Sequence, residues 1–132
     1  MNYRKIFNKK TILITGHTGF KGSWLTLWLL NLGGKIVGVS KNTLTSPSHF
    51  NSLKLSKSII SKSVDITNFL KFRKIINTTK PDFIFHLAAQ ALVKKSYINT
   101  LDTWQSNLMG TVNLLESLKN YKKKVNVILI TS

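Results

Sequence analysis

The chain has 132 residues, enough for one domain with a hydrophobic core of its own, and no cysteine, which excludes disulfides and thiolate metal sites. Its 20 Lys and Arg residues outnumber its 4 Asp and Glu residues, and a formal charge of +16 is of the kind found in nucleic-acid-binding proteins. Because the lysines are spread along the chain without an interleaved array of aromatic residues, we interpret them as solvated surface and expect no nucleic-acid partner.

Short β-branched runs alternate with longer helix-like stretches, which is the pattern of parallel strands joined by crossover helices. Thr11 to Thr15 is predicted as the first strand and Lys35 to Ser40 as the second. The helix between them is expected from Gly22 to Leu32 and is ended by Gly33-Gly34, because glycine best tolerates left-handed backbone geometry. The polar segment Lys41 to Ser52 is predicted as a loop.

The second half continues the alternation. A weak third strand is expected at Ile59 to Asp65, and Thr67 is expected to cap a helix with apolar residues at helical spacing. Phe83 to Leu87 is apolar enough to be a strand buried on both faces. A helix at Leu101 to Leu118 and a strand at Val125 to Ile130 complete a five-stranded, Rossmann-type doubly wound parallel sheet. That helix carries an apolar stripe of Trp104, Leu108, Val112 and Leu115.

Nothing in the sequence indicates a membrane protein. No run approaches the roughly 18 apolar residues of a membrane span, and the basic N-terminus, MNYRKIFNKK, lacks the apolar core of a secretory signal. We therefore expect a cytoplasmic protein with no membrane partner.

Three glycines at a spacing of three residues, Gly16, Gly19 and Gly22, lie between the first strand and the first helix in the sequence TGHTGFKGSWL. In this context Gly16 allows a tight turn, Gly19 lets the backbone approach a pyrophosphate, and Gly22 lets the helix pack close to the strand. The helix start adds free N–H groups and the positive end of its dipole. We therefore predict a dinucleotide-binding loop.

Other conspicuous residues have plainer interpretations. Trp24 and Trp28 lie four residues apart on one helix and are predicted to pack in the core. His86, at a strand end, is interpreted as a structural histidine. Because His17 and His49 are distant from it in sequence and carboxylates are scarce, we expect no metal site.

Four motifs together resemble the extended short-chain dehydrogenases, the NAD-dependent epimerase and dehydratase family. They are the Gly-x-x-Gly-x-x-Gly loop, Asp65 after the third strand, His86-Leu87-Ala88-Ala89 at the end of the fourth, and Asn107-Leu108-Met109-Gly110-Thr111 in the next helix. Within that family, TGHTGFKGSWL, HLAAQALVKKSY and NLMGTVNLLE are similar to the CDP-glucose 4,6-dehydratases. The resemblance implies an NAD(P)-binding Rossmann domain over residues 1–132, incomplete and without its C-terminal substrate domain.

The resemblance also implies contacts with the cofactor. The pyrophosphate would be wrapped by Gly16, Thr18, Gly19, Phe20, Lys21 and Gly22. The adenine would face Asp65 and Ile66, with the carboxylate accepting a hydrogen bond from the exocyclic amine, although Asp65 could instead cap the next helix. The ribose and nicotinamide side would be lined by Leu87, Ala88, Ala89 and Gln90.

Further residues are implied for the substrate. The nucleotide-sugar would be approached by Gln90, Lys95, Ser96 and Tyr97. Asn107 would hold a backbone kink beside the site. Ser132 matches the hydroxyl residue that, in the family, helps the catalytic tyrosine bind the sugar 4-hydroxyl.

The cofactor that the resemblance favours is NAD, while the residues leave NADP open. NAD sites usually have an acid near the end of the second strand that bonds the ribose 2′-hydroxyl, yet the sequence there is Ser40-Lys41-Asn42. Ser40 or Asn42 could bond the ribose, and Lys41 could accept a 2′-phosphate.

The family's reaction, as the resemblance implies it, moves a hydride from C4 of CDP-glucose to the nicotinamide, eliminates water across C5 and C6, and returns the hydride to C6. Its base is a tyrosine four residues before a lysine that lowers the tyrosine pKa. No tyrosine here has a lysine at that distance, since the residues four positions on are Phe7, Leu101 and Val125. We therefore expect a chain that retains cofactor contacts but does not turn over by itself.

Two alternatives stay open: a fragment of another nucleotide-sugar epimerase or dehydratase, and a non-catalytic dinucleotide-binding domain. The resemblance implies a homodimer through the Leu101 to Leu118 helix, because extended dehydrogenases commonly dimerise on this face, and a non-catalytic domain could pair with an intact relative through the same helix.

Overall fold

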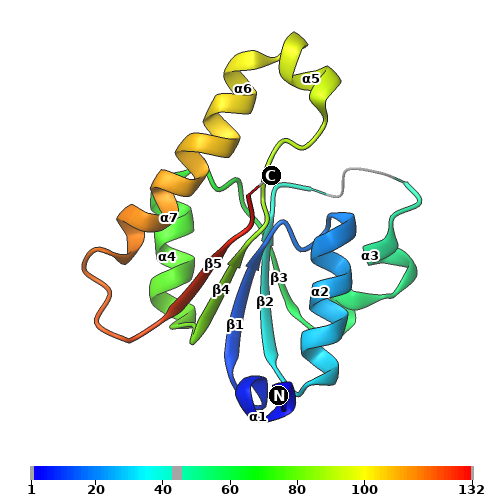
Figure 1. Cartoon of the computed structure of the whole chain (residues 1–132), viewed down its shortest axis with the longest axis vertical. Helices are drawn as coiled ribbons and strands as arrows, with labels where there is room; N and C mark the ends of the chain where they lie inside the picture. The colour runs from blue at the N-terminus through cyan, green and yellow to red at the C-terminus, as the bar shows by residue number, and fades with distance from the viewer. Residues whose placement is uncertain (1, 43–45, 132) are drawn as a thin grey trace.

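A computed structural model describes residues 2–42 and 46–131. Five parallel strands form one sheet in the order β3-β2-β1-β4-β5, with helices on both faces (Figure 1). The strands are β1 (Thr11–Thr15), β2 (Lys35–Ser40), β3 (Ile60–Ser63), β4 (Phe83–His86) and β5 (Asn126–Leu129). The helices are α1 (Tyr3–Phe7), α2 (Phe20–Asn31), α3 (His49–Ser52), α4 (Phe69–Thr79), α5 (Val93–Ile98), α6 (Thr100–Trp104) and α7 (Gly110–Leu118), with a 3-10 turn η1 (Leu55–Lys57) and a π-helical segment η2 (Gln105–Met109). This strand order confirms the predicted Rossmann-type fold.

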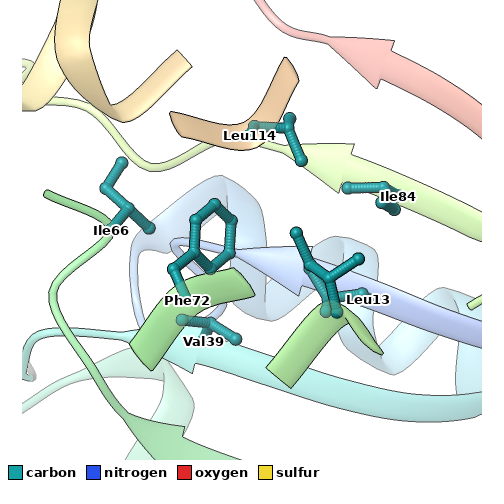
Figure 2. Close-up of a cluster of buried hydrophobic side chains, with 7 residues drawn as sticks. Leu13, Val39, Ile66, Phe72, Ile84 and Leu114 are labelled. Carbon is teal, nitrogen blue, oxygen red and sulfur yellow. The ribbon is translucent and has the colours of Figure 1, made fainter. Parts of the chain in front are cut away.

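One core lies between the sheet and the helices α4 and α7. Successive strand residues point to opposite faces, so Leu13, Val39 and Ile84 meet from three neighbouring strands (Figure 2). Phe72 of α4 and Leu114 of α7 close over them, and both are fully buried. This cluster holds α4 and α7 against the centre of the sheet.

A second core lies on the opposite face, under α1 and α2. Ile12 and Ile36 meet Leu29 of α2 there, and Phe7 of α1 belongs to the same cluster. The Phe7 ring packs against Phe83 of β4, with ring centroids 5.0 Å apart. The sequence did not predict α1, because five residues are too few to show helical periodicity.

Several element boundaries differ from the prediction. α2 begins at Phe20, two residues earlier than expected. α4 is capped by Asn68 and not by Thr67, because the Asn68 side chain accepts a hydrogen bond from the Lys71 N–H. The segment predicted as a loop contains α3, a single turn capped by Ser48. Residues 43–45 of that loop lie outside the described part of the chain.

The prediction that Trp24 and Trp28 lie in the core is wrong, since they are 51% and 46% exposed. The side of α2 that faces the sheet carries Gly22, Ser23, Thr26 and Leu29. Small residues lie inside because the helix runs too close to the sheet for a large ring. Trp24 stacks on His49 of α3 with ring centroids 4.5 Å apart, and Trp28 packs edge-on against Tyr3 of α1 at 5.6 Å.

The helix predicted at Leu101 to Leu118 consists of α6, η2 and α7, so a π-helical turn interrupts it in the middle. The residues of α7 that are buried are Gly110, Asn113, Leu114 and Ser117. The apolar stripe predicted from Trp104 to Leu115 lies on the outer side, where its members are 41% to 62% exposed. Over residues 2–42 and 46–131, none of the helices combines the length and the apolar character needed to cross a bilayer.

Candidate functional site

The loop between β1 and α2 turns at the carboxyl edge of the sheet, where ligands bind in open α/β folds (Figure 1). Gly16 has a φ of +75°, which L side chains rarely adopt, and a Cβ there would lie 2.9 Å from the Ala88 nitrogen. A Cβ at Gly22 would overlap the Gly16 carbonyl oxygen. The backbone therefore requires Gly16 for its positive φ and its approach to Ala88, and Gly22 because α2 packs directly against the turn.

Gly19 differs from the other two glycines of the motif, because its backbone conformation suits any residue. Its φ is −71°, and the nearest atom to an added Cβ is the Gly16 carbonyl oxygen at 3.3 Å. Gly19 is also the N-cap of α2, and no side chain caps the first turn. The open space and the N–H groups at this point fit an anionic diphosphate, which the helix dipole attracts.

Three other predicted contacts surround this opening. Phe20 and Lys21 lie on the solvent side of the first turn of α2, with Phe20 71% exposed. Thr18 instead contacts the end of β2. Its hydroxyl donates to the Asn42 carbonyl at 2.9 Å, and its N–H donates to Ser40 Oγ at 3.4 Å. Thr18 thus joins the loop to the strand end where the adenosine ribose is expected.

His17 anchors the same loop from beneath. It is 1% exposed, and its Nε2 lies 2.7 Å from Ser61 Oγ on β3. The ring lies so close to Gly38 of β2 that a Cβ there would overlap it, and Phe50 of α3 packs edge-on at 5.1 Å. Burial lowers the pKa of His17, so the ring is neutral at pH 7. The histidine therefore packs under the loop and does not point into the opening.

Asp65, predicted to face the adenine, forms an ion pair with Lys41. Lys41 Nζ lies 3.0 Å from Asp65 Oδ2, and Asp65 Oδ1 accepts a hydrogen bond from the Thr67 N–H at 2.9 Å. Burial opposes the change, but the hydrogen bonds from Thr67 and Lys41 lower the pKa of Asp65 below its usual value. The carboxylate is thus ionised and oriented, and it does not cap α4.

Ile66, the other residue predicted near the adenine, has a different environment. It is 6% exposed, and its side chain belongs to the cluster of Figure 2. Gly110 of α7 approaches it so closely that a Cβ there would overlap Ile66. The Ile66 carbonyl accepts a hydrogen bond from Asn113 Nδ2 at 2.9 Å. Of the predicted pair, Asp65 is the residue with a polar group at the surface.

The hydroxyl of Thr15 joins the end of β1 to the end of β4. Its oxygen accepts hydrogen bonds from the N–H groups of Leu87 and Ala88, each at 3.1 Å. Its proton is therefore free to be donated to His86 Nδ1, which lies 2.9 Å away. We accordingly assign the ring proton of His86 to Nε2. Burial lowers the pKa of His86 to about 4.

The hydrogen-bond chain continues from His86 into the helical segment beside it. His86 Nε2 lies 3.3 Å from Thr111 Oγ1, and the Thr111 hydroxyl donates to the Asn107 carbonyl at 2.9 Å. His86 is 4% exposed and has a partner on each ring nitrogen, in agreement with the structural role predicted for it. This series of hydrogen bonds joins the ends of β1 and β4 to α7 and η2, next to the Leu87 and Ala88 backbone that Thr15 holds.

Asn107, predicted to hold a backbone kink, lies within the π-helical segment η2. Its Oδ1 accepts from the Gln90 N–H at 2.7 Å, and its Nδ2 donates to the Gln90 carbonyl at 3.2 Å. The side chain of Gln90 is in turn bonded to the Leu92 backbone through both ends of its amide, at 2.6 and 2.9 Å. Asn107 thus holds the backbone after β4 in place, and the side-chain amide of Gln90 holds the same segment through its bonds to the Leu92 backbone.

The remaining predicted residues lie further along the same edge of the sheet. Ala89 is exposed after β4. Lys95, Ser96 and Tyr97 lie on α5, above the carboxyl ends of the strands (Figure 1), and Tyr97 is 83% exposed. Ser132 lies outside the described residues.

Sequence reasoning missed three anchors of this site: the Thr15 hydroxyl, Thr111, and the contact of Lys41 with Asp65. Thr15 directly precedes Gly16, but nothing along the chain shows that its hydroxyl meets the N–H groups of Leu87 and Ala88. Thr111 ends the motif Asn107 to Thr111, but its contact with His86, like the Lys41–Asp65 ion pair, depends on which segments the fold brings together.

The fold and the glycine loop define a protein of the Rossmann class with a dinucleotide-type turn. A family profile described as GDP-mannose 4,6 dehydratase matches residues 13–132, and the chain belongs to this family of nucleotide-sugar dehydratases and epimerases. It is 42% identical over 127 residues to the CDP-glucose 4,6-dehydratase of Salmonella typhimurium, which covers 94% of this chain and 35% of that protein. It is 34% identical over 125 residues to the UDP-glucuronate 4-epimerase of Thermodesulfobacterium geofontis, covering 91% of this chain and 39% of that one.

Solved structures of nucleotide-sugar epimerases have the same fold as this chain. The UDP-glucose 4-epimerase of Thermotoga maritima with UDP-glucose superposes with a TM-score of 0.78 at 28% identity, over 90% of this chain and 37% of the other. The Thermus thermophilus UDP-glucose 4-epimerase in complex with NAD has a TM-score of 0.74 at 27% identity, over 84% and 34%. The chain therefore spans little more than a third of the length of the relatives it matches.

Proposed function

We propose that residues 1–132 form the NAD-binding part of a cytoplasmic nucleotide-sugar 4,6-dehydratase, a lyase that converts CDP-glucose to CDP-4-keto-6-deoxyglucose for deoxysugar and polysaccharide synthesis. The observation that carries the proposal is the opening at Gly19, between two glycines that the backbone requires and an uncapped helix start. The 42% identity to a CDP-glucose 4,6-dehydratase supports the substrate.

The proposed cofactor contacts follow from this geometry. The first turn of α2 would bind the diphosphate through its N–H groups, with Thr18 and Lys21 beside it. Asp65 would accept a hydrogen bond from the adenine amine. Leu87 and Ala88, held by Thr15, would line the ribose and nicotinamide side. When bound, NAD supplies a reversible hydride acceptor.

The other predicted residues have proposed roles on the substrate side. Asn107 would keep the segment at Gln90 in place, and the exposed side chains of α5 would contact the nucleotide-sugar. The predicted ones that are exposed are Lys95 and Tyr97, and Ser96 is half-buried between them with its hydroxyl donating to the Val93 carbonyl at 2.6 Å. Ser132 would contact the sugar 4-hydroxyl. Because none of the tyrosines has a lysine four residues on, the residues proposed here bind cofactor and substrate and do not supply the base.

Calorimetric titration of the purified chain with NAD tests the proposal. We expect saturable binding that Gly19→Val abolishes, because its side chain would occupy the space proposed for the diphosphate. Thr78→Ala, on the exposed surface of α4, is the control and should bind as the unaltered chain does. No NAD binding, or equal binding by Gly19→Val, would contradict the proposal.

A panel of CDP-glucose, UDP-glucose and GDP-mannose, titrated into the NAD-loaded chain completed with the C-terminal part that its longer relatives have, tests the substrate. We expect CDP-glucose to bind most tightly. Preference for another nucleotide-sugar would favour a related epimerase or dehydratase. Binding of NAD with no nucleotide-sugar would favour a non-catalytic dinucleotide-binding domain.

We also propose that the chain forms a homodimer through the outer face of α6, η2 and α7. Trp104 and Leu108 are 62% and 49% exposed there, and both line a shallow apolar hollow. Light scattering should report a dimer that Leu108→Glu converts to monomer. Leu70→Glu, which adds the same charge at a 75% exposed position of α4, should remain dimeric. A monomer at all concentrations would contradict this.

A further inference from the structure

The end of β2 carries a positive charge, where the NAD site proposed above would usually have a negative one. In this fold the adenosine ribose lies at the end of the second strand, where an acid bonds the 2′-hydroxyl of NAD and a cation accepts the 2′-phosphate of NADP. This chain has Ser40-Lys41-Asn42 at that point, with a cation and no acid. By itself, Lys41 would favour NADP.

The backbone around Lys41 is fixed on both sides. Ser63 Oγ donates to the Lys41 carbonyl at 3.0 Å, and the Val64 N–H donates to the Ser40 carbonyl at 3.0 Å. On the other side, Thr18 Oγ1 donates to the Asn42 carbonyl at 2.9 Å. The backbone of Lys41 is therefore held in place, while its side chain, which is 74% exposed, can rotate toward different charged groups.

The side chain of Lys41 forms its ion pair with Asp65. The Asp65 Oδ2 is 3.0 Å from Lys41 Nζ, while the Thr67 N–H holds the other carboxylate oxygen in place. Two of the chain's other three acids are paired elsewhere, Asp82 with Lys123 and Glu116 with Lys119. The carboxylate that neutralises Lys41 thus comes from the end of β3, next to the strand end that lacks an acid.

We propose that Asp65, by holding the ammonium group of Lys41, makes this site select NAD over NADP. The inference rests on the proposed function. With the pair formed, the positive charge is neutralised and a carboxylate lies close to where a 2′-phosphate dianion would sit, so NADP is repelled. A ribose hydroxyl, which is uncharged, can still bond to Lys41. Because the pair is exposed and not held by burial, a single substitution at Asp65 should free the lysine and shift the preference toward NADP.

Titration of the full chain with NAD and with NADP tests this through the ratio of the two affinities. We expect the unaltered chain to bind NAD more tightly. Asp65→Asn should shift the ratio toward NADP about tenfold, because a free lysine gains a charge-assisted hydrogen bond to the 2′-phosphate. Glu116→Gln changes the net charge equally on the surface of α7 and should leave the ratio within about twofold, which controls for long-range attraction.

The double variant separates the ion pair from other roles of Asp65. In the double variant Lys41→Gln/Asp65→Asn the lysine is absent, so the tenfold shift of the affinity ratio toward NADP should vanish. If Asp65 acted only on the adenine amine, Asp65→Asn would weaken both cofactors by the same factor, and that result would overturn the inference. Lys41→Gln, at an exposed side chain, serves if Asp65→Asn fails to fold; an unchanged ratio in it would also overturn the inference. Failure of the unaltered chain to bind either cofactor would refute the proposed function itself.

Discussion

Helices α2 and α7 lie on opposite faces of the sheet and are built alike, yet their outer surfaces differ. Each buries a glycine, small polar residues and one leucine on its inner side. The buried hydroxyls bond to carbonyls of their own helix, Thr26 to Gly22 at 2.8 Å and Ser117 to Asn113 at 2.7 Å. Close packing against a sheet thus uses small side chains and one large one, and the large apolar residues are left to the outside.

The difference lies in what covers those outer residues. Trp24 and Trp28 of α2 have aromatic partners from α3 and α1 of the same chain. On the other face, Trp104 has no aromatic partner within the described residues, and Leu115 is 49% exposed. The outer face of α2 is therefore an intramolecular contact, while that of α6 and α7 is the surface for which we propose a second copy.

The largest expected effect is a difference in unfolding free energy between substitutions on the inner and outer sides of α7. Leu114→Ala removes a fully buried side chain from the cluster of Figure 2 and should lower the free energy of unfolding by about 3 kcal/mol. Leu115→Ala, one residue on, should cost less than about 1 kcal/mol at concentrations where the chain is monomeric. Urea denaturation followed by circular dichroism measures both, and equal losses would contradict the orientation of the helix.

The start of α2 offers a similar pair. Gly22→Ala should destabilise the fold by roughly 2–3 kcal/mol, because its Cβ would overlap the backbone of Gly16. Gly19→Ala should cost under about 1 kcal/mol, since its φ is ordinary and its closest contact is 3.3 Å. Thermal unfolding distinguishes them. If Gly19→Ala were the more damaging variant, the helix would approach the turn differently from the geometry described.

Acid should destabilise the fold through His86, whose buried ring lies between Thr15 at the end of β1 and Thr111 of α7. Its pKa falls from 6.5 in the unfolded chain to about 4 in the folded one, so the unfolded state binds the extra proton between these values. Stability is therefore complete above pH 6.5 and falls as the pH drops, by about 2 kcal/mol between pH 7 and pH 5. Denaturation of His86→Gln at both pH values should show a smaller loss, with the remainder coming from His17, whose pKa is also lowered by burial. An unchanged loss would exclude His86 as the source.

The smallest effect concerns the outer aromatic residues. Trp28→Ala should cost about 1 kcal/mol, because it removes the edge-on contact with Tyr3. Trp104→Ala should cost less than about 0.5 kcal/mol in the monomer but should weaken the proposed dimer. Denaturation at low and high protein concentration compares the two variants. If Trp104→Ala lowered the free energy of unfolding equally at both concentrations, a dimer contact at Trp104 would be contradicted.

The sequence was sufficient for β1, β2 and β4, because parallel strands in the middle of a sheet have short continuous apolar runs, whereas β3 is exposed along its length and its bounds were predicted less well. β1 and β2 were predicted at their observed bounds, and the turn after β1 follows from its glycines. The faces of α2 were not predictable from periodicity, since periodicity assumes that large residues such as Trp24 point inward. The single-turn helix α3 was also missed, because a single turn has no period.

The Lys41–Asp65 contact shows why part of the site needed the structure. The two residues are distant in sequence and meet because the register of β2 and β3 places Ser40 opposite Ser63. No pattern along the chain encodes that register. From the sequence, Lys41 suggested a phosphate contact and Asp65 an adenine contact, and their pairing changes the expected role of both.

The packing of His17 on Gly38 has a consequence for how such sequences can diverge. Because an added methyl group at position 38 would overlap the imidazole ring, a chain can keep the histidine in its glycine loop only while the middle of β2 stays a glycine. Aligned homologues should therefore vary at these two positions together, and a side chain at position 38 should occur only where position 17 is small. Redesign of the loop for another cofactor would have to alter the strand as well.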